Sequence, residues 1–268
     1  RHKQMNCAID IDELKKLQLE ILKYVAAFCE NHHINYWLTA GTLLGAVRHQ
    51  GYIPWDDDID IGMKREDYTI FTQQFNHGDN KRYSFHCLEN DKNYLYPMGK
   101  VLDNATVLYE PNKEYGYQIA VYIDVFVYDH IPSDPSIVKK LYRQRDFYLR
   151  MRYLRDAREH SGSYLRKKLV HAVSLCLKVF PTIFIAKRIA AIGKKYREDE
   201  TGFYGDLVGE HRVIIDAAIL SSFVKLKFED GEYLVPADYD KWLTLFFGNY
   251  MQLPPEEQRV SHHNFEVF

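Results

Sequence analysis

Apolar residues near the start of the chain recur at intervals of three and four, after two candidate helix caps, Asp10 and Asp12. The recurring positions are Leu14, Leu17, Ile21, Val25 and Phe28. This spacing places all five side chains on one face of a helix, because a helix turns once in about 3.6 residues. The pattern therefore predicts an amphipathic helix whose apolar face packs on a core.

Farther along the chain, short alternating and β-branched segments are mixed with helical ones. The pattern predicts strands at residues 34–39, 59–63, 83–88 and 117–128 and helices at residues 42–48 and 65–75. Residues 100–102 and 106–109 flank the turn-prone pair Asp103-Asn104, which predicts a hairpin. A second hairpin is predicted around Asp230-Gly231, followed by a helix at residues 238–247. The fold class expected from this order is α/β, with a mixed sheet flanked by helices.

A basic helical stretch separates the predicted sheet from the second hairpin. Residues 139–200 contain 17 Lys or Arg and 6 Asp or Glu, whereas the whole chain has 35 basic and 37 acidic side chains. Gly162 and Pro181 are the predicted breaks in this stretch. Its longest segment of low charge, residues 169–186, is interrupted by Lys178 and Pro181, so no transmembrane helix of about 20 residues is predicted. Two interpretations stay open, an amphipathic segment that contacts anionic lipid and a helical subdomain with an ordinary solvated face.

Length and composition narrow the class of protein. The chain has 268 residues, 46% apolar and 27% charged, which excludes a collagen, a disordered tail, a disulfide-stapled miniprotein and a polytopic membrane protein. We expect three units along it: a core at residues 1–133, the basic helical region at residues 134–200, and a C-terminal hairpin and helix at residues 201–268. The formal net charge of −2 is not that of a nucleic-acid-binding protein, so no nucleic-acid partner is expected.

The cysteines and the first residues bear on location in the cell. Four cysteines are present, with neither a Cys-x-x-Cys pair nor a histidine at metal-binding spacing. We expect Cys7, Cys29, Cys87 and Cys176 to be buried apolar thiols of a reducing compartment. The first residues lack the basic flank, apolar core and cleavage site of a secretion signal. The predicted location is the cytoplasm, and the inner face of the plasma membrane if the basic region contacts lipid.

Four carboxylates lie within five positions, at Asp56, Asp57, Asp58 and Asp60. In a strand, residues two apart point to the same face, so Asp58 and Asp60 form a pair. Two such carboxylates repel each other unless a cation lies between them, and hard oxygen ligands favour Mg²⁺ or Mn²⁺. For the Asp-x-Asp pattern alone, a solvated acidic turn after Pro54 is the competing interpretation.

Two further features favour a binding site over a solvated turn. A predicted strand ends at Thr39 and leads into Gly41-Thr42, whose free backbone N–H groups at a helix start can bind a phosphate. Asp124 is a lone acid in the apolar strand at residues 122–126, and its burial costs several kcal/mol unless it is paired or bound to metal. Together these features form the layout of a nucleotidyltransferase-like active site.

The segment at residues 40–62 reads A-G-T-L-L-G-A-V-R-H-Q-G-Y-I-P-W-D-D-D-I-D-I-G and resembles the signature of the LicD family. Further matches are residues 100–103, residues 122–126 and motifs between residues 238 and 255. The resemblance spans roughly residues 14–263 and is weak across the basic helical region. It implies a nucleotidyltransferase-like mixed sheet flanked by helices, to which the basic helical region is added.

Members similar to this chain transfer phosphocholine from CDP-choline to sugars of bacterial teichoic acid or lipopolysaccharide. The resemblance therefore implies a CDP-choline donor, a lipid-linked glycan acceptor, release of CMP, and Mg²⁺ or Mn²⁺ as cofactor. It also implies that Asp58 and Asp60 hold the metal ion, that Asp124 completes the site, and that Gly41-Thr42 faces the phosphates of the nucleotide. We expect Asp124 to be the base that accepts the proton of the attacking hydroxyl.

Arg48 and Lys100 are candidate phosphate contacts, because Arg offers a planar fork of donors and Lys a point charge. For each of them an ordinary surface cation is the alternative interpretation. For the whole chain, the alternatives are a transferase that uses another CDP-activated alcohol and a nucleotidyltransferase that acts on a small molecule or RNA. A non-catalytic binding module is disfavoured, because Asp58, Asp60 and Asp124 are all present.

Overall fold

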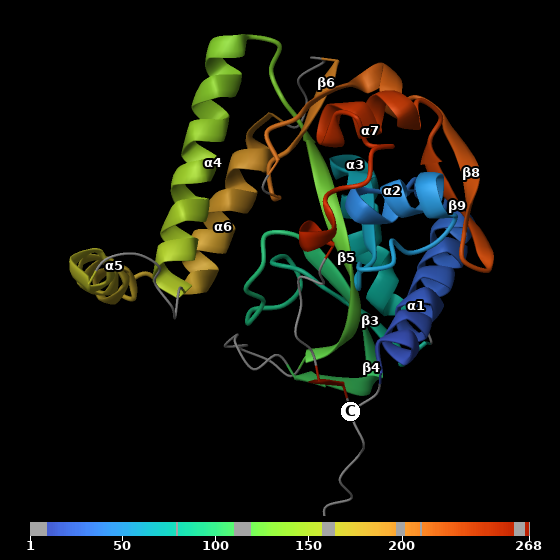
Figure 1. The fold of residues 1–268 in the computed structure, drawn as a ribbon, viewed down its shortest axis with the longest axis horizontal. Coiled ribbons are helices and arrows are strands. Elements are labelled where there is room, and N and C mark those ends of the chain that lie inside the picture. The colour runs from blue at the N-terminus through green and yellow to red at the C-terminus, as the bar shows by residue number, and fades with distance from the viewer. Residues whose placement is uncertain are drawn as a thin grey trace, which may run out of the picture.

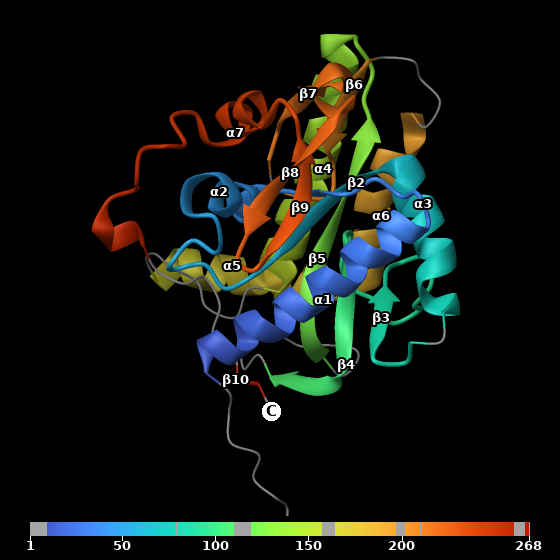
Figure 2. The ribbon, with the colours of Figure 1, turned by 90° about the vertical axis from the view of Figure 1, so that its right-hand side faces the viewer.

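The centre of the fold is one mixed, eight-stranded β-sheet with helices on both sides (Figures 1 and 2). The computed structural model describes residues 10–78, 80–109, 119–156, 164–196, 202–209, 211–259 and 266–267. Within these residues the strands of the sheet are β1 (Trp37–Leu38), β2 (Asp60–Lys64), β3 (Tyr83–His86), β4 (Gly99–Tyr109), β5 (Ile119–His130), β6 (Phe203–Asp206), β7 (Ile214–Asp216) and β10 (Glu266–Val267). Two further strands, β8 (Phe223–Phe228) and β9 (Gly231–Pro236), form a separate hairpin.

The helices of the described residues precede, interrupt and follow the strands. They are α1 (Ile11–Asn31), α2 (Ala40–His49), α3 (Arg65–Gln74), α4 (Pro135–Asp156), α5 (Tyr164–Leu177), α6 (Thr182–Gly193) and α7 (Tyr239–Phe247). Short 3-10 turns are η1 (Phe75–His77), η2 (Lys194–Tyr196), η3 (Ala217–Leu220) and η4 (Glu256–Gln258). The mixed sheet flanked by helices confirms the fold class expected from the sequence.

The first helix follows the predicted apolar spacing. Asp10 is its N-cap, and the Asp10 carboxylate accepts a hydrogen bond from the backbone N–H of Glu13 at 2.9 Å. Its buried face includes Leu14, Ile21 and Val25, and this face packs against β4 and β5. Burial of such side chains stabilises the helix far more than its intrinsic propensity does.

Strand β5 organises the sheet. It pairs in parallel with β2 and antiparallel with β4 and β6, while β1 is antiparallel to β2 and β3 is antiparallel to β4. Parallel neighbours need a crossover connection, which here runs from α3 through β4. The strand predicted at residues 34–39 is confined to β1, and residues 117–118 of the predicted fourth strand lie outside the described residues.

The hairpin predicted at residues 100–109 is wrong, because this segment is the single strand β4. The pairing register with β5 shifts between Asp103 and Leu108, so the Asp-Asn pair produces an irregularity in a strand rather than a turn. The Asp103 side chain is fully buried and accepts hydrogen bonds from Arg82 at 2.8 Å and from the N–H of Ala105 at 3.1 Å. These contacts satisfy the polar groups of the pair within the sheet.

The C-terminal hairpin and helix have the predicted order. The β8–β9 hairpin and α7 confirm the elements expected around Asp230-Gly231 and at residues 238–247. Trp242 of α7 and Trp37 of β1 are both fully buried, with their ring centroids 5.7 Å apart. The C-terminal segment therefore shares the core of the sheet.

The basic helical region stands on one side of the sheet. In Figure 1, α4 and α6 lie across β5 from α1 and α2, and α5 lies beyond α4 and α6. Helices α4 and α6 pack through Met151, Ile185 and Ile189. Pro181 precedes α6, which confirms the break predicted there, whereas the break predicted at Gly162 lies outside the described residues.

Helix α5 is largely exposed, since only one of its side chains at residues 168–177 is buried. Within the described ranges no single helix is long and apolar enough to cross a membrane. The segments Lys168–Leu177 and Thr182–Tyr196 reach that length and apolar content only together, and they are bent by 80°.

Cys29 and Cys87 are buried as expected, but Cys176 on α5 is exposed, so the expectation of a buried thiol is wrong there. Cys7 lies outside the described residues.

Candidate active site

Three charged side chains lie side by side across the middle of the sheet. Asp60 of β2 is in register with Asp124 of β5, and Asp124 is in register with Lys100 of β4. Residues in register on neighbouring strands point to the same face, so these side chains form one row. Lys100 Nζ lies 2.5 Å from Asp124 Oδ1, and the exposed fractions of the two side chains are 7% and 14%. The structure thus brings together three of the predicted site residues.

The electrostatics of the row fit a cation that is additional to Lys100. Burial raises the pKa of the Asp60 carboxyl well above its ordinary value, and the negative charges of Asp58, Asp124 and Asp56 raise it further. The positive charge of Lys100 acts in the opposite direction. The ionised form of Asp60 is therefore destabilised, and a divalent cation held by these oxygens would remove that cost. Carboxylate oxygens are the ligands that Mg²⁺ and Mn²⁺ prefer.

The acidic run before β2 brings Asp56 and Asp57, which the sequence analysis did not assign to the site, next to Asp58, which it did. Carboxylate oxygens of Asp56, Asp57 and Asp58 lie within 4.8 Å of one another. Asp56 also forms a side-chain hydrogen bond with Asp58, although burial raises the pKa of Asp56 overall. Asp56 could have been predicted from the sequence. Positions 56, 58 and 60 point to the same face if the segment before β2 is also extended. Asp58 connects this cluster to Asp60 of the row.

The turn from β1 into α2 is tied to the row through its backbone. The N–H of Asp60 donates to Thr42 Oγ1 at 2.8 Å, and the N–H of Thr39 donates to the carbonyl oxygen of Asp60 at 3.0 Å. Between them Ala40 has a φ of 47°, a left-handed conformation that is strained for a residue with a Cβ. These contacts fix the start of α2 beside Asp60. The Thr42 hydroxyl serves this positioning, and a phosphate contact by Gly41 and Thr42 stays a prediction.

Gly41 lies against the acidic run, and a side chain at this position is expected to disturb the site. A Cβ on Gly41 would come within 2.5 Å of Asp56 Oδ2. We expect Gly41→Ala to displace the Asp56 carboxylate and to lower catalytic activity roughly 10-fold to 100-fold, the scale of a 1 Å misplacement. Steady-state kinetics test this, with Gly78→Ala as the matched control, because no atom lies within 4 Å of a Cβ there. Equal activity of both variants would contradict a role for Asp56 in the site.

A cavity of about 400 Å³ adjoins Asp60. Its aromatic lining consists of Tyr96, Phe126, Tyr128 and Phe246. Phe126 and Tyr128 follow Asp124 at every second position of β5 and therefore share the face of the row. A larger cavity of about 650 Å³ lies between α1 and the end of α3 and has no carboxylate in its lining. Of these two cavities, the smaller, aromatic one is therefore the one that adjoins the row.

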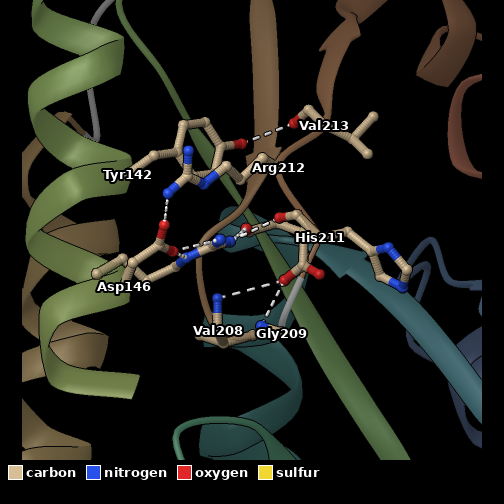
Figure 3. A network of polar contacts seen from close by, with 9 residues as sticks. Tyr142, Asp146, Val208, Gly209, His211, Arg212 and Val213 are labelled. Carbon is tan, nitrogen blue, oxygen red and sulfur yellow. Dashed lines mark hydrogen bonds and ion pairs between the residues drawn. The ribbon is translucent and has the colours of Figure 1, made fainter. Parts of the chain in front are cut away.

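One wall of the aromatic cavity is formed by α4 and the loop after β6, which are joined by buried polar contacts (Figure 3). The Tyr142 hydroxyl donates to the carbonyl oxygen of Val213 at 2.7 Å. Arg145, with 1% of its side chain exposed, donates to the carbonyl oxygens of Asp206 and His211 at 2.9 and 2.6 Å. These bonds fix the position of α4 relative to the loop.

Arg152 of α4 lines this cavity together with Asp60, although it belongs to the basic helical region. Its guanidinium lies 5.0 Å from the ring centroid of Tyr96, and its Nε lies 3.9 Å from Asp156 Oδ2. Burial lowers the pKa of Arg152, so an anion in the cavity would stabilise its charged form. The sequence analysis missed this residue, because nothing in the local pattern distinguishes it from the other cations of α4.

Arg48, the second predicted phosphate contact, makes its contacts elsewhere. Its Nη1 donates to the carbonyl oxygen of Tyr250 at 2.9 Å, and its Nε donates to His49 Nδ1 at 3.4 Å. Arg48 follows Gly41 by seven residues, which is about 10 Å along the axis of α2. The structure does not join Arg48 to the row, and its contact with a phosphate stays a prediction.

Comparisons with known proteins identify the family of the chain. Residues 33–158, which contain the acidic run and the whole row, match the family described as LicD/FKTN/FKRP, nucleotidyltransferase domain. The chain is 30% identical to the lipopolysaccharide cholinephosphotransferase LicD of Haemophilus influenzae, over 97% of its own length and 98% of the relative. This chain belongs to the LicD family.

Shorter similarities connect this LicD-family chain to other transferases. It is 48% identical over 48 residues to the ribitol 5-phosphate transferase FKRP of Homo sapiens, which covers 18% of the chain and 10% of FKRP. It is 33% identical over 60 residues to the ribitol-5-phosphate transferase FKTN of Mus musculus, which covers 22% of the chain and 13% of FKTN. The resemblance to the LicD family predicted from residues 40–62 is confirmed, and these three named relatives are transferases of a phosphorylated alcohol.

Proposed function

We propose that this LicD-family chain transfers phosphocholine from CDP-choline to a sugar hydroxyl of a lipid-linked precursor of lipopolysaccharide or teichoic acid. The hydroxyl oxygen attacks the choline-bearing phosphorus, the bond from that phosphorus to the bridging oxygen breaks, and CMP leaves. The observation that carries this proposal is the row of Asp60, Asp124 and Lys100 beside an aromatic cavity. Full-length similarity to a cholinephosphotransferase supports the choice of phosphocholine.

Asp58 and each residue of the row have a proposed task. Asp58, Asp60 and Asp124 would hold a Mg²⁺ or Mn²⁺ ion, which when bound neutralises the charge of the diphosphate and of the leaving CMP. Asp124 accepts the proton of the sugar hydroxyl through Oδ2, while Lys100 holds Oδ1 at 2.5 Å and fixes the orientation of the carboxylate. Transfer of a phosphoryl group depends mainly on such placement and charge neutralisation.

The aromatic cavity suits the choline end of the donor. Quaternary ammonium groups bind over aromatic faces within about 6 Å of the ring centroid. The cations of Lys100 and Arg152 both lie 5.0 Å from the ring centroid of Tyr96, so a choline group would need the faces of other rings in the lining, because like charges repel each other. Phe126 and Phe246 provide further aromatic surface in the same lining.

Arg152 is the proposed partner of the donor's diphosphate from the α4 side. We expect Arg152→Met to raise the KM for CDP-choline about 10-fold to 100-fold, the scale of one lost hydrogen bond to a charged group, with a smaller change in kcat. Steady-state kinetics at fixed acceptor test this. Arg150→Met is the matched control, because Arg150 lies on the same helix and is exposed. An unchanged KM in both variants would remove Arg152 from the donor site.

The proposed reaction is tested by release of CMP from CDP-choline in the presence of a lipid-linked glycan fraction. We expect release that requires Mg²⁺ or Mn²⁺, stops on addition of EDTA and rises with acceptor. An Asp58→Asn/Asp60→Asn double variant is expected to release no CMP above background. Metal-dependent release of CMP from a different donor only would support the reaction type and contradict phosphocholine as the transferred group. Release of CMP that is unaffected by EDTA would contradict the proposed dependence on a metal ion.

Transfer of another CDP-activated alcohol is the second candidate function. The observation that favours it is the 48% identity, over a short segment, with a ribitol 5-phosphate transferase. CDP-ribitol and CDP-glycerol in place of CDP-choline test this alternative. An uncharged polyol gains little from aromatic faces, so we expect CDP-choline to have the highest kcat/KM of the three.

A further inference from the structure

Helix α5 and the α5–α6 corner present apolar side chains that the rest of the described chain does not cover. We call the following set the α5 surface: Leu169, Val173, Leu175, Val179, Phe180 and Phe184, with exposed fractions between 36% and 78%. Among the α5 side chains that the structure describes, Ser174 alone is buried, and its hydroxyl donates to the carbonyl oxygen of Arg155 at 3.1 Å. A helix of a water-soluble domain normally buries its apolar stripe, and contiguous exposed patches mark interaction sites.

The residues around the α5 surface are positively charged. Between residues 160 and 197 the sequence contains nine Lys or Arg and neither Asp nor Glu. Lys178, Lys187 and Arg188 are exposed in the structure. A second copy of this segment would bring like charges together, whereas the headgroups of an anionic membrane are complementary to them.

The geometry favours a position on the membrane over a position across it. The 14 residues of α5 span about 21 Å, which is shorter than a hydrocarbon core of about 30 Å. Helix α6 is not free to extend α5, because Ile185 and Ile189 are fully buried in contact with the end of α4. The chain also bends by 80° between the two segments. In Figure 1, α5 stands clear of the sheet, beyond α4.

We infer that α5 and the α5–α6 corner dock this protein on the surface of an anionic membrane. The apolar side chains of the α5 surface enter the boundary between headgroups and acyl chains, and the surrounding cations contact the headgroups. Helix α4 links this surface to the candidate active site: Arg155, which receives the Ser174 bond, is one helical turn from Arg152 in the cavity wall. Docking itself does not depend on the identity of the donor. Its use in reaching a lipid-linked acceptor rests on the proposed function.

The experiment is flotation of the full chain with two kinds of vesicle, pure phosphatidylcholine and phosphatidylcholine mixed with phosphatidylglycerol. We expect the protein to float with the mixed vesicles, to bind pure phosphatidylcholine at least about tenfold more weakly, and to be released by high salt. Leu169→Gln/Val179→Gln is expected to weaken binding to mixed vesicles at least about tenfold, because two apolar side chains no longer enter the bilayer. Lys178→Gln/Lys187→Gln/Arg188→Gln is expected to weaken it about a hundredfold.

Matched controls make equivalent changes on another surface. Ile214→Gln/Val224→Gln replaces two apolar side chains that are 46% and 41% exposed, and Lys225→Gln/Lys227→Gln/Lys241→Gln removes three exposed cations of β8 and α7. We expect both controls to float like wild type, and all variants to keep the CD spectrum and the CMP release with a water-soluble acceptor. Absence of flotation, equal binding to both vesicles, or equal loss in the controls would each overturn the inference. A solution dimer that Leu169→Gln/Val179→Gln dissociates would overturn it too, because a second copy would then cover the α5 surface.

Discussion

Replacement of Asp60 by Asn is expected to lower the rate of phosphocholine transfer by about 10³-fold or more. The substitution removes one negative charge from the cluster of Asp58, Asp60 and Asp124, the three proposed metal ligands. A factor of 10³ corresponds to about 4 kcal/mol of activation free energy, within the several kcal/mol that charge neutralisation by a held metal ion supplies. Asp124→Asn is expected to have an effect of the same size. The measurement is kcat/KM for CDP-choline at saturating Mg²⁺.

A stability measurement separates this loss of chemistry from damage to the fold. Because burial and neighbouring negative charges raise the pKa of Asp60 above its unfolded value, the folded state loses stability as pH rises from the unfolded pKa toward and through the folded pKa. The amide that replaces the carboxyl in Asp60→Asn is uncharged at every pH, so this loss is absent from the variant. We therefore expect the variant to unfold at a higher temperature than wild type in EDTA, with a difference that grows from pH 5 to pH 8. A variant less stable at both pH values would attribute its inactivity to misfolding.

Asp67→Asn is the matched control for this prediction. Asp67 is on α3, its carboxylate accepts the N–H of Asn35 at 3.0 Å, and burial raises its pKa as it does for Asp60. It has no place in the row of Asp60, Asp124 and Lys100, so its conversion to Asn should leave the rate of transfer unchanged. Near-native transfer by Asp60→Asn would contradict the proposed metal site.

The register of the sheet explains how much of the site the sequence could predict. Local alternation was enough to identify Asp60 and Asp124 as acids in strands. That they are adjacent depends on the parallel pairing of β2 with β5, which joins segments more than 60 residues apart. Nothing local specifies which strands pair, because pairing is decided by the packing of the whole core. The contact of Lys100 with Asp124 follows from the same register and was equally beyond local reasoning.

Tertiary contacts also explain the errors. The Asp103-Asn104 pair has a strong turn preference, yet Arg82 pairs with Asp103 and keeps the segment extended inside β4. Arg152 is one of many cations in the basic helical region, and only the packing of α4 against the loop after β6 places it in the aromatic cavity. Propensity thus predicted most elements, and it failed where a distant side chain determines the local conformation.

Replacement of Asp129 by Ala is expected to lower the free energy of unfolding by about 3–5 kcal/mol, because it leaves the guanidinium of Arg65 buried without its partner. Arg65 Nε and Nη2 donate to the two Asp129 oxygens at 2.6 and 2.9 Å, and the side chains are 5% and 1% exposed. The pair joins α3 to β5, and a Cβ on Gly193 of α6 would overlap Asp129 Oδ2, so α6 packs directly on it. Denaturant unfolding of the purified variant measures the loss. Lys16→Ala is the control, because the Lys16–Glu13 pair is 72% and 48% exposed and should contribute less than about 1 kcal/mol.

A double variant tests whether the buried pair itself or the charge left behind causes the loss. In Arg65→Met/Asp129→Leu both charges are replaced by apolar groups of similar size, so neither desolvated charge remains. We expect this double variant to recover most of the stability lost in Asp129→Ala, although it contains one more substitution. The outcome that would contradict this explanation is a double variant as unstable as Asp129→Ala, since the loss would then come from packing around Gly193 and not from an unpaired guanidinium. Strand β5 also carries Asp124, on the face opposite to Asp129. The same variants therefore test whether a change at the far end of the strand affects the row. Recovered stability with normal CMP release would show that the Arg65–Asp129 pair stabilises the fold and takes no part in the reaction.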